Sequence, residues 1–174
     1  EERQKELVQY RRAIHSKPEL KYEEENTAEI VKLHLKKLGL TFQDRIAKTG
    51  IVSLIDSGIP GKTVLVRADM DALPIHEENT TDYISQNPGV MHACGHDSHT
   101  AILMGIAEAF AKIRADLPGR VLFVFQPAEE GAPAGERGGA SLMLEEGVFD
   151  LAMPEVAFGL HVTSTLKVGS IGYR

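Results

Sequence analysis

Short apolar runs alternate along this chain with segments whose apolar residues recur at helical intervals. The run over 63–68 is rich in β-branched residues and the run over 121–125 is entirely apolar, so both are typical of buried strands. Before and between such runs, residues 26–38 and 98–110 carry apolar side chains on one helical face. Strands that alternate with helices predict an α/β fold with a mostly parallel mixed sheet flanked by helices.

Capping and turn residues set the expected limits of the other elements. Asn26 followed by Glu29 resembles a capping box, and Gly39 and Gly147 are typical of positions just beyond helix ends. Helices are expected over 1–16, 26–38, 98–110 (capped by Asp97 or Ser98) and 138–146, with short strands over 42–46, 51–55, 156–162 and 166–171 and a loop over 75–89.

Composition excludes several classes of protein. A chain of 174 residues is long enough for one sizeable core. A net charge of −6 without a Lys/Arg cluster argues against a nucleic-acid surface. No apolar run approaches the roughly 20 residues that a membrane span needs, and no signal peptide is visible. Cys94 is the only cysteine and cannot form an intramolecular disulfide, which favours a reducing compartment, most simply the cytoplasm.

Candidate metal chemistry is concentrated in two stretches. Residues 91–99 read M-H-A-C-G-H-D-S-H, and residues 126–131 read Q-P-A-E-E-G. They supply a thiol at Cys94, an imidazole at His96 and two adjacent carboxylates, a ligand set that suits borderline divalent metals. A lone C-x-H is more often a buried cysteine beside surface histidines. The acidic pair downstream makes a metal site the better interpretation.

The predicted sheet brings further polar residues to one edge. Asp69 and Asp71 follow the first buried strand, at the carboxyl end where open α/β sheets bind ligands, although simple turn chemistry explains them equally well. Glu129 and Glu130 follow the second strand, and His161 lies near the end of a third. A cation would relieve the repulsion between the adjacent carboxylates. One glutamate then binds metal, while the other takes a proton from a metal-bound water whose pKa falls from about 15.7 to about 7.

Four ordered motifs resemble the aminoacylase/carboxypeptidase family of dinuclear metallohydrolases. They read R-A-D-M-D-A-L-P-I, M-H-A-C-G-H-D-S-H-T-A, Q-P-A-E-E-G and G-L-H-V. The most similar branch contains N-acyl-amino-acid amidohydrolases, hippurate hydrolases and indole-acetyl-amino-acid hydrolases. The early H-S-K-P-E-L-K-Y-E-E-E-N-T-A is similar to the N-terminal motif of that branch, so the likeness runs from His15 to the last residues.

The resemblance implies two divalent metal ions, with zinc or manganese expected first and cobalt or nickel also permitted by the donor set. In the wider family, the position of Asp69 often holds a histidine ligand. His92 and His99 match no ligand position, and hydrogen bonding behind the ligands or helix capping is expected of them, whereas His15, His34 and His76 are expected to be ordinary surface or structural residues. The residues that match the family's site are the bridging ligand Cys94, the terminal ligands His96, Glu130 and His161, the general base Glu129 and the orienting acid Asp71.

Family members also continue beyond the point that matches the end of this chain. The resemblance therefore implies that residues 1–174 are the N-terminal part of the catalytic metal-binding domain. A satellite domain that makes the homodimer contact, and a C-terminal return to the metal domain, would lie outside it. That outer part carries a further histidine ligand in the family. Its absence agrees with ligand counting, because the matched ligands supply fewer than three bonds per ion even when the thiolate bridges.

The sequence thus predicts a metal-dependent amidohydrolase that cleaves the amide bond of an N-acyl amino acid or small peptide, with no nucleic-acid or membrane partner. One alternative is a metal-binding or regulatory domain of this family without catalysis. Another makes Cys94 a nucleophile with a nearby histidine as its base, which leaves the glutamate pair without a role. A zinc nucleobase deaminase fits less well, because the P-C-x-x-C half of its signature is absent.

Overall fold

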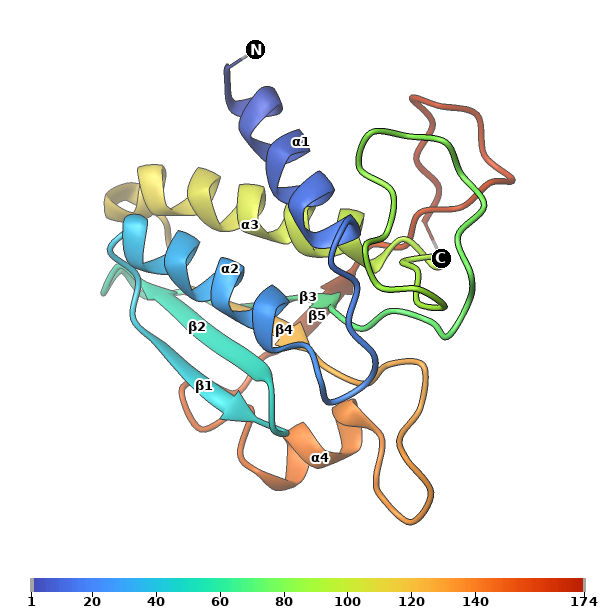
Figure 1. Cartoon of the computed structure of the whole chain (residues 1–174). Coiled ribbons are helices and arrows are strands. Elements are labelled where there is room, and N and C mark those ends of the chain that lie inside the picture. Colours follow the sequence, from blue (N-terminus) through green and yellow to red (C-terminus); the bar gives the residue numbers. More distant parts are fainter. Residues whose placement is uncertain (1, 174) are drawn as a thin grey trace.

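Five strands form one mixed sheet in the computed structural model, which describes residues 2–173 (Figure 1). Helices α2 (Glu25–Lys37) and α3 (His96–Ile113) cover one face of the sheet, and α1 (Glu2–His15) packs against them on the same side. The short helix α4 (Gly139–Glu145) lies on the other face. The expected α/β class, a mixed sheet flanked by helices, is thereby confirmed.

The strand order brings three carboxyl ends to one edge. The order across the sheet is β1-β2-β4-β3-β5. Strand β3 is parallel to β4 and β5, whereas β2 is antiparallel to β1 and β4. Ligands bind at the carboxyl ends of parallel strands in open α/β sheets. The bounds are β1 (Phe42–Ile46), β2 (Gly50–Asp56), β3 (Thr63–Asp69), β4 (Arg120–Gln126) and β5 (Val156–Gly159), and a single 3₁₀ turn (Arg114–Asp116) follows α3.

Strand β4 lies at the centre of the sheet and is buried on both faces. Its residues 121–126 are all buried. Phe123 packs in one cluster with Leu103 of α3, and Leu122 packs in a second cluster with Met143 of α4. Alternate strand residues point to opposite faces, so a continuous apolar run serves two cores. Burying each such side chain contributes about 1.5–3 kcal/mol to the stability of the fold. This burial anchors the end of β4, which directly precedes the turn with Glu129 and Glu130, called here the acidic turn.

Helix α2 begins differently from the expectation. Asn26 does not cap it, and the capping-box prediction is wrong. The carboxylate of Glu19 instead accepts hydrogen bonds from the backbone N–H groups of Asn26 at 2.8 Å and Thr27 at 2.9 Å. A carboxylate from the preceding turn thus satisfies the free N–H groups of the first turn. Gly39 has a φ of +69° just after the helix, as predicted for that position.

Helix α3 also begins without the predicted cap. It starts at His96, after Gly95, whose φ of +88° lies in the left-handed region, and neither Asp97 nor Ser98 caps it. A side chain at Gly95 would collide with Val162. A glycine at this position therefore lets the backbone turn into the helix beneath the C-terminal segment. This turn sets the position of the His96 backbone, from which the imidazole extends.

The C-terminal part holds less strand than expected. Strand β5 ends at Gly159, so the predicted strand over 156–162 is shorter at its C-terminal end. The predicted strand over 166–171 is wrong, because these described residues hold a bend at Leu166 and a turn at Val168 and Gly169, and none of them is in a strand. The N–H of Ser170 bonds to the carbonyl of Lys167 at 3.0 Å, and Gly169 has a φ of +86°. No described neighbour offers this segment a strand to pair with, and an apolar alternation alone does not make a strand.

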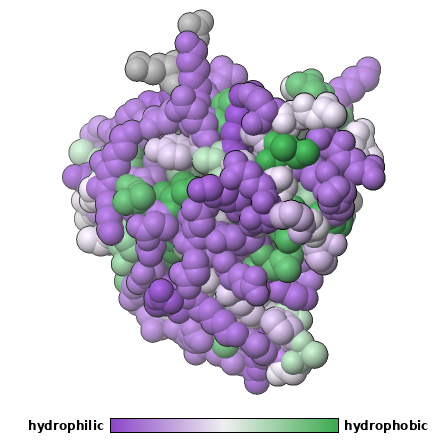
Figure 2. Space-filling model, viewed as in Figure 1, coloured by the Kyte–Doolittle hydropathy of each residue, from purple (hydrophilic) through white to green (hydrophobic). Residues whose placement is uncertain are grey.

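The face of the molecule in Figure 2 is mainly hydrophilic, with hydrophobic residues in scattered patches. Exposed large apolar side chains occur along the whole described chain, and the three most exposed, Val168, Tyr173 and Ile171, lie beyond β5. Among residues 2–173, no helix combines the length and hydrophobicity that crossing a membrane requires.

Candidate metal centre

The carboxyl ends of the three parallel strands carry the predicted acidic residues to one place. Asp69 ends β3 and Asp71 follows it, and each is only 1% exposed. Glu129 and Glu130 occupy the turn directly after β4. His161 lies just beyond β5 and is exposed. The predicted convergence of these residues at one sheet edge is what the structure contains.

His96 lies at the centre of this group. Its side chain is fully buried, because the first residue of α3 packs against the sheet edge. Its Nε2 lies 3.7 Å from a carboxylate oxygen of each of Asp69, Glu129 and Glu130. Within the described chain Nε2 has no hydrogen-bonding partner, and the nearest carboxylate to Nδ1 is that of Asp71, at 3.3 Å. A buried imidazole nitrogen that lacks a partner and faces three carboxylates needs a cation or a proton between them.

Cys94 adds a thiol to the same group. Its Sγ lies 3.4 Å from Nε2 of His161. The donor atoms of Cys94, His96 and His161 all lie within 4.8 Å of one another, and so do those of His96, Glu129 and Glu130. His96 belongs to both sets and to a third with Asp69 and His99, so three three-donor sets share one imidazole. All four residues predicted as metal ligands are therefore close together in the fold.

Asp71 contacts both the turn that carries Glu130 and the imidazole of His96. Its Oδ2 accepts a hydrogen bond from the backbone N–H of Glu130 at 2.9 Å. Its Oδ1 lies 3.3 Å from Nδ1 of His96. Burial opposes ionisation of Asp71, but His96 and the backbone N–H groups of Glu130 and Glu129 outweigh burial and lower the pKa of Asp71. An ionised Asp71 holds Nδ1 of His96 on one side and leaves Nε2 facing the other donors.

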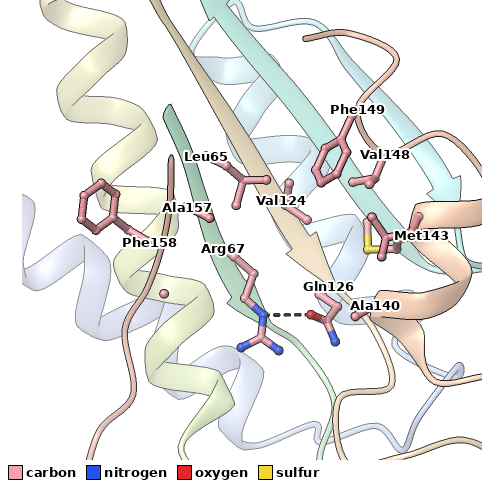
Figure 3. A pocket seen from close by; sticks show the side chains of 12 residues that line it. Leu65, Arg67, Val124, Gln126, Ala140, Met143, Val148, Phe149, Ala157 and Phe158 are labelled. Carbon is pink, nitrogen blue, oxygen red and sulfur yellow. Dashed lines mark hydrogen bonds between the residues drawn. The ribbon is translucent and has the colours of Figure 1, made fainter. Parts of the chain in front are cut away.

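Arg67 interacts with the acidic edge from within β3. Its Nη1 lies 2.7 Å from Oδ2 of Asp69, and its Nη2 lies 3.9 Å from Oε1 of Glu129. Its Nε donates to Oε1 of Gln126 at 2.9 Å, at the end of a pocket that is otherwise lined mainly by apolar side chains (Figure 3). The sequence analysis did not single out Arg67. A lone charge inside an apolar strand is the signal that points to it, because such a charge requires partners.

His99 uses both of its ring nitrogens and is 2% exposed. Its Nδ1 lies 2.6 Å from Oδ1 of Asp69, and its Nε2 accepts a hydrogen bond from the backbone N–H of Val162 at 2.9 Å. An imidazole engaged in this way has no free lone pair for a metal. The expectation that His99 makes hydrogen bonds is confirmed, whereas its place behind metal ligands stays a prediction. Through Val162 it also holds the residue next to His161.

A second buried polar cluster lies behind the start of α3. Nδ1 of His15 lies 2.7 Å from Oδ2 of Asp97, and Nε2 of His15 lies 2.9 Å from Oε1 of Glu77. Nε of Arg11 lies 2.7 Å from the same oxygen of Asp97. The hydrogen bond to Asp97 is the main cause that raises the pKa of His15. His15 is thus a structural residue, as expected, and this cluster connects α1 to the residue that follows His96.

His92 differs from the expectation. It is 4% exposed, yet neither of its ring nitrogens has a hydrogen-bonding partner among residues 2–173. The expected hydrogen bond behind the ligands is absent for this residue, and it caps no helix. Burial lowers the pKa of His92 to about 4, so its imidazole is neutral at neutral pH.

The electrostatics of the site fit a bound divalent cation. Burial, followed by the neighbouring Glu130, raises the pKa of Cys94 to about 12. Burial opposes charge on His96, but Asp71, Asp69 and Glu129 more than offset it and raise its pKa. The Cys94 thiol therefore keeps its proton at neutral pH, and the surrounding carboxylates favour a proton on His96 as well. A metal ion would replace those protons, because thiolate and neutral imidazole are the ligand forms. Nε2 of His96 has no other partner and is therefore available to bind such an ion.

Comparison with known proteins adds a family and a set of relatives. The family model described as peptidase family M20/M25/M40 matches residues 65–174. An N-acyl-L-amino acid amidohydrolase of Geobacillus stearothermophilus is 46% identical over 166 residues, which are 95% of this chain and 43% of that protein. Thermostable carboxypeptidase 1 of Saccharolobus solfataricus is 42% identical over 97% of this chain and 42% of its own length.

Solved structures show the same likeness. The crystal structure of a dinuclear metal binding peptidase of Bacillus subtilis superposes with a TM-score of 0.88 and 38% sequence identity. The match covers 98% of this chain and 46% of that one. The chain therefore spans less than half the length of these relatives.

Proposed function

The chain belongs to peptidase family M20/M25/M40, and from that membership we propose that it is the metal-binding part of a metal-dependent amidohydrolase. The proposed reaction is hydrolysis of the amide bond of an N-acyl amino acid or small peptide. The names of the amidohydrolase and carboxypeptidase relatives support this reaction class. The convergence of the donor residues supports its metal dependence.

The buried, unpartnered Nε2 of His96 is the observation that carries the proposal. It faces the carboxylates of Asp69, Glu129 and Glu130 at 3.7 Å each. A buried polar atom usually has a partner, and the exceptions mark functional or ligand-binding positions. Structural ion pairing alone would align a carboxylate with this nitrogen at hydrogen-bond distance. Three equal, longer distances instead leave room for an ion among the donors.

We assign two divalent ions to this site, in agreement with the dinuclear metal binding stated for the Bacillus subtilis relative. Zinc or manganese fits the donor set best, and cobalt or nickel is compatible with it. When bound, the ions would polarise the amide carbonyl and make water more acidic. Cys94 is the proposed bridging ligand, and the proposed terminal ligands are His96, Glu130 and His161.

Glu129 is the proposed general base. Its side chain is 39% exposed, compared with 26% for that of Glu130. It is therefore the carboxylate of the pair that is more accessible to water. Its Oε2 would take a proton from the attacking water and pass it to the leaving nitrogen, which becomes the free amine. A positioned general base contributes about 10²–10⁴-fold to turnover.

Asp71 is proposed to orient the site rather than to react. It is buried, and its two oxygens contact His96 and the backbone of Glu130, so it faces a proposed ligand on each side. Loss of such a residue typically costs about 10–100-fold in metal affinity or activity.

The Cys94 nucleophile hypothesis fits the surroundings less well. Nε2 of His161 lies 3.4 Å from Sγ of Cys94, as a catalytic base would. Nucleophilic cysteines, however, occur in electropositive surroundings that lower the thiol pKa. Here burial and the acidic residues around the thiol raise the pKa of Cys94 to about 12. The same surroundings suit a thiolate that forms only when a cation binds.

We further propose that residues 1–174 are the N-terminal part of a catalytic domain in a longer, homodimeric protein. The supporting fact is that the matched relatives are more than twice as long as the matched region. The rest of such a protein would supply a further histidine ligand and much of the substrate pocket. Cys94 must be reduced to bind metal, and a free cysteine agrees with the proposed cytoplasmic location.

The proposal is tested by measuring the metal content of the whole protein together with its hydrolysis of N-acetyl, hippuryl and indole-acetyl amino acids. Two ions per protein and release of a free amino acid from at least one substrate class are expected. Turnover that persists after complete removal of metal by a chelator would contradict metal dependence. Stable binding of two ions without hydrolysis of any of these substrates would favour a metal-binding domain without catalysis.

A further inference from the structure

Glu24 is a completely buried carboxylate far from the proposed metal ligands in sequence. It lies just before α2 and is 0% exposed. Its Oε1 accepts a hydrogen bond from the backbone N–H of Ala128 at 2.9 Å, and its Oε2 accepts one from the hydroxyl of Thr49. Both contacts are to parts of the chain distant in sequence. A buried acid whose partners are both neutral donors is costly, and needs a reason.

Ala128 is the residue where the acidic turn changes direction. Its φ of +46° lies in the left-handed region, which is uncommon for a residue with a side chain, and it is 1% exposed. Its carbonyl accepts a hydrogen bond from the N–H of Gly139 at 3.1 Å. A side chain on Gly139 would collide with the backbone of Pro127. The backbone between Pro127 and Glu129 is therefore closely packed in a single conformation. A strained conformation of this kind persists only where its surroundings hold it.

The same turn is held on its far side by the metal centre. The N–H of Glu130 bonds to Asp71 at 2.9 Å, and Asp71 contacts His96. The turn is thus attached at Ala128 to Glu24 and at Glu130 to Asp71, with Glu129 between the two. Loss of the Glu24 contact frees the turn to leave the left-handed conformation. Such a change rotates the backbone immediately before both acidic side chains.

We propose that Glu24 is a positioning residue that sets the direction of the Glu129 and Glu130 carboxylates through its hydrogen bond to Ala128. This inference rests on the proposed function for its effect on metal binding and turnover. Its effect on the turn itself is independent of that function. Burial raises the pKa of Glu24, while Thr49 and the N–H of Ala128 oppose the rise. The positioning needs only an acceptor oxygen, so a neutral amide can replace the carboxylate.

Three variants of the full chain separate positioning from stability. Glu24→Met keeps the volume but removes both acceptors. Glu24→Gln keeps one acceptor oxygen for the N–H of Ala128. Thr49→Val is the matched control, because it removes the other partner of Glu24 and leaves the bond to Ala128 in place. Each is measured for melting temperature, amide hydrogen exchange, Mn²⁺ affinity per folded molecule and, in the whole protein, kcat and KM.

Glu24→Met is expected to weaken binding of one of two Mn²⁺ ions by about 10–100-fold and to lower kcat more than it changes KM. It should also accelerate exchange at the amides of Ala128 and Glu130, although Glu24 does not contact Glu130. Glu24→Gln should retain most of the wild-type Mn²⁺ affinity and kcat, with slow exchange at Ala128 and Glu130. Thr49→Val should lower the melting temperature but leave Mn²⁺ affinity unchanged. Should Glu24→Met fail to fold, Glu24→Asp still decides: its carboxylate is one methylene shorter and draws back from the N–H of Ala128. Glu24→Asp is therefore predicted to accelerate exchange at Glu130, whereas Glu24→Gln and Thr49→Val are not.

The inference is overturned if the Glu24 variants and Thr49→Val lower the melting temperature alike and leave Mn²⁺ affinity and exchange at Glu130 as in the wild type. Failure of the proposed function has a different signature, because the wild-type protein itself would then bind no Mn²⁺ and hydrolyse no substrate. In that case the exchange of the Glu130 amide still tests whether Glu24 sets the conformation of the turn.

Discussion

Nδ1 of His99 lies 2.6 Å from Oδ1 of Asp69, and this contact connects the end of β3 to the segment that carries His161. Because the N–H of Val162 donates to Nε2 of His99 at 2.9 Å, that nitrogen must be unprotonated and the proton must reside on Nδ1. Asp69 therefore fixes the tautomer of His99. The tautomer in turn allows Val162, and with it His161, to lie beside Cys94.

Asp69→Asn is expected to weaken metal binding by about 10–100-fold. The two oxygens of Asp69 serve His99 and Arg67 separately, whereas asparagine offers only one oxygen. If His99 loses its acceptor, the segment that carries His161 shifts. If Arg67 loses its acceptor, the side chains of residue 69 and Glu129 shift. Isothermal titration with Mn²⁺ measures the affinity.

Thr100→Val is the matched control for that change. The hydroxyl of Thr100 donates to the backbone carbonyl of Asp69 at 2.7 Å and leaves its carboxylate untouched. The control should lose about 1 kcal/mol of unfolding free energy and keep its Mn²⁺ affinity. Equal affinity in Asp69→Asn and the wild type would show that the contact between Asp69 and His99 does not order the site.

Cys94→Ser should lose metal as well as activity. The thiolate is the only soft donor in the described site, and a serine hydroxyl binds the same ions much more weakly because it stays protonated. Elemental analysis of the purified variant measures the loss. A variant that keeps two ions per protein but does not turn over would instead support the Cys94 nucleophile hypothesis.

His15→Gln is expected to destabilise the fold most at mildly acidic pH. The contacts of His15 with Asp97 and Glu77 raise its pKa above the ordinary 6.5, against burial and the nearby Arg11. A raised pKa in the folded state stabilises the protein fully below the unfolded value, and the benefit is lost as the pH rises through the folded value. The difference in melting temperature between wild type and variant should therefore shrink as the pH is raised from about 6 to 9.

Comparing the two proteins at each pH removes the opposing effects of His92 and His34, whose pKa values burial lowers. The carboxylates Asp97 and Glu77 stay ionised over this range, because their pKa values are lowered. A difference in melting temperature that does not depend on pH would mean that His15 acts by packing alone.

The sequence was sufficient to predict the buried strands and the amphipathic helices, because their apolar periods leave few alternatives. The capping of α2 was predicted wrongly, since Glu19 reaches the helix from a preceding turn and competes with the local Asn26 pattern. The strand expected over 166–171 was also wrong. A short apolar segment forms a strand only if a partner strand is present, and the described chain offers none there.

The candidate site was predictable where chemistry is local in sequence. Cys94, His96 and the glutamate pair lie in two short stretches, and the parallel strand ends bring them together. The partners of Arg67 and Glu24 were not predictable, although the lone charge of Arg67 in an apolar strand indicates that it needs some, because Gln126 and Ala128 lie far away in the chain. The unpartnered state of His92 could not be foreseen either, since local sequence does not show which buried groups lack partners.

The most direct test of the proposed metal centre is the metal content of Glu129→Gln and Glu130→Gln, measured side by side in the whole protein. Glu129, as a general base, should be dispensable for the ions. Its variant is expected to keep both while turnover falls by about 10²–10⁴-fold. Glu130, as a ligand, is expected to lose metal on substitution. Full metal occupancy in both variants, with only mild effects on turnover, would show that the acidic pair is a solvated surface feature and would contradict the metallohydrolase account.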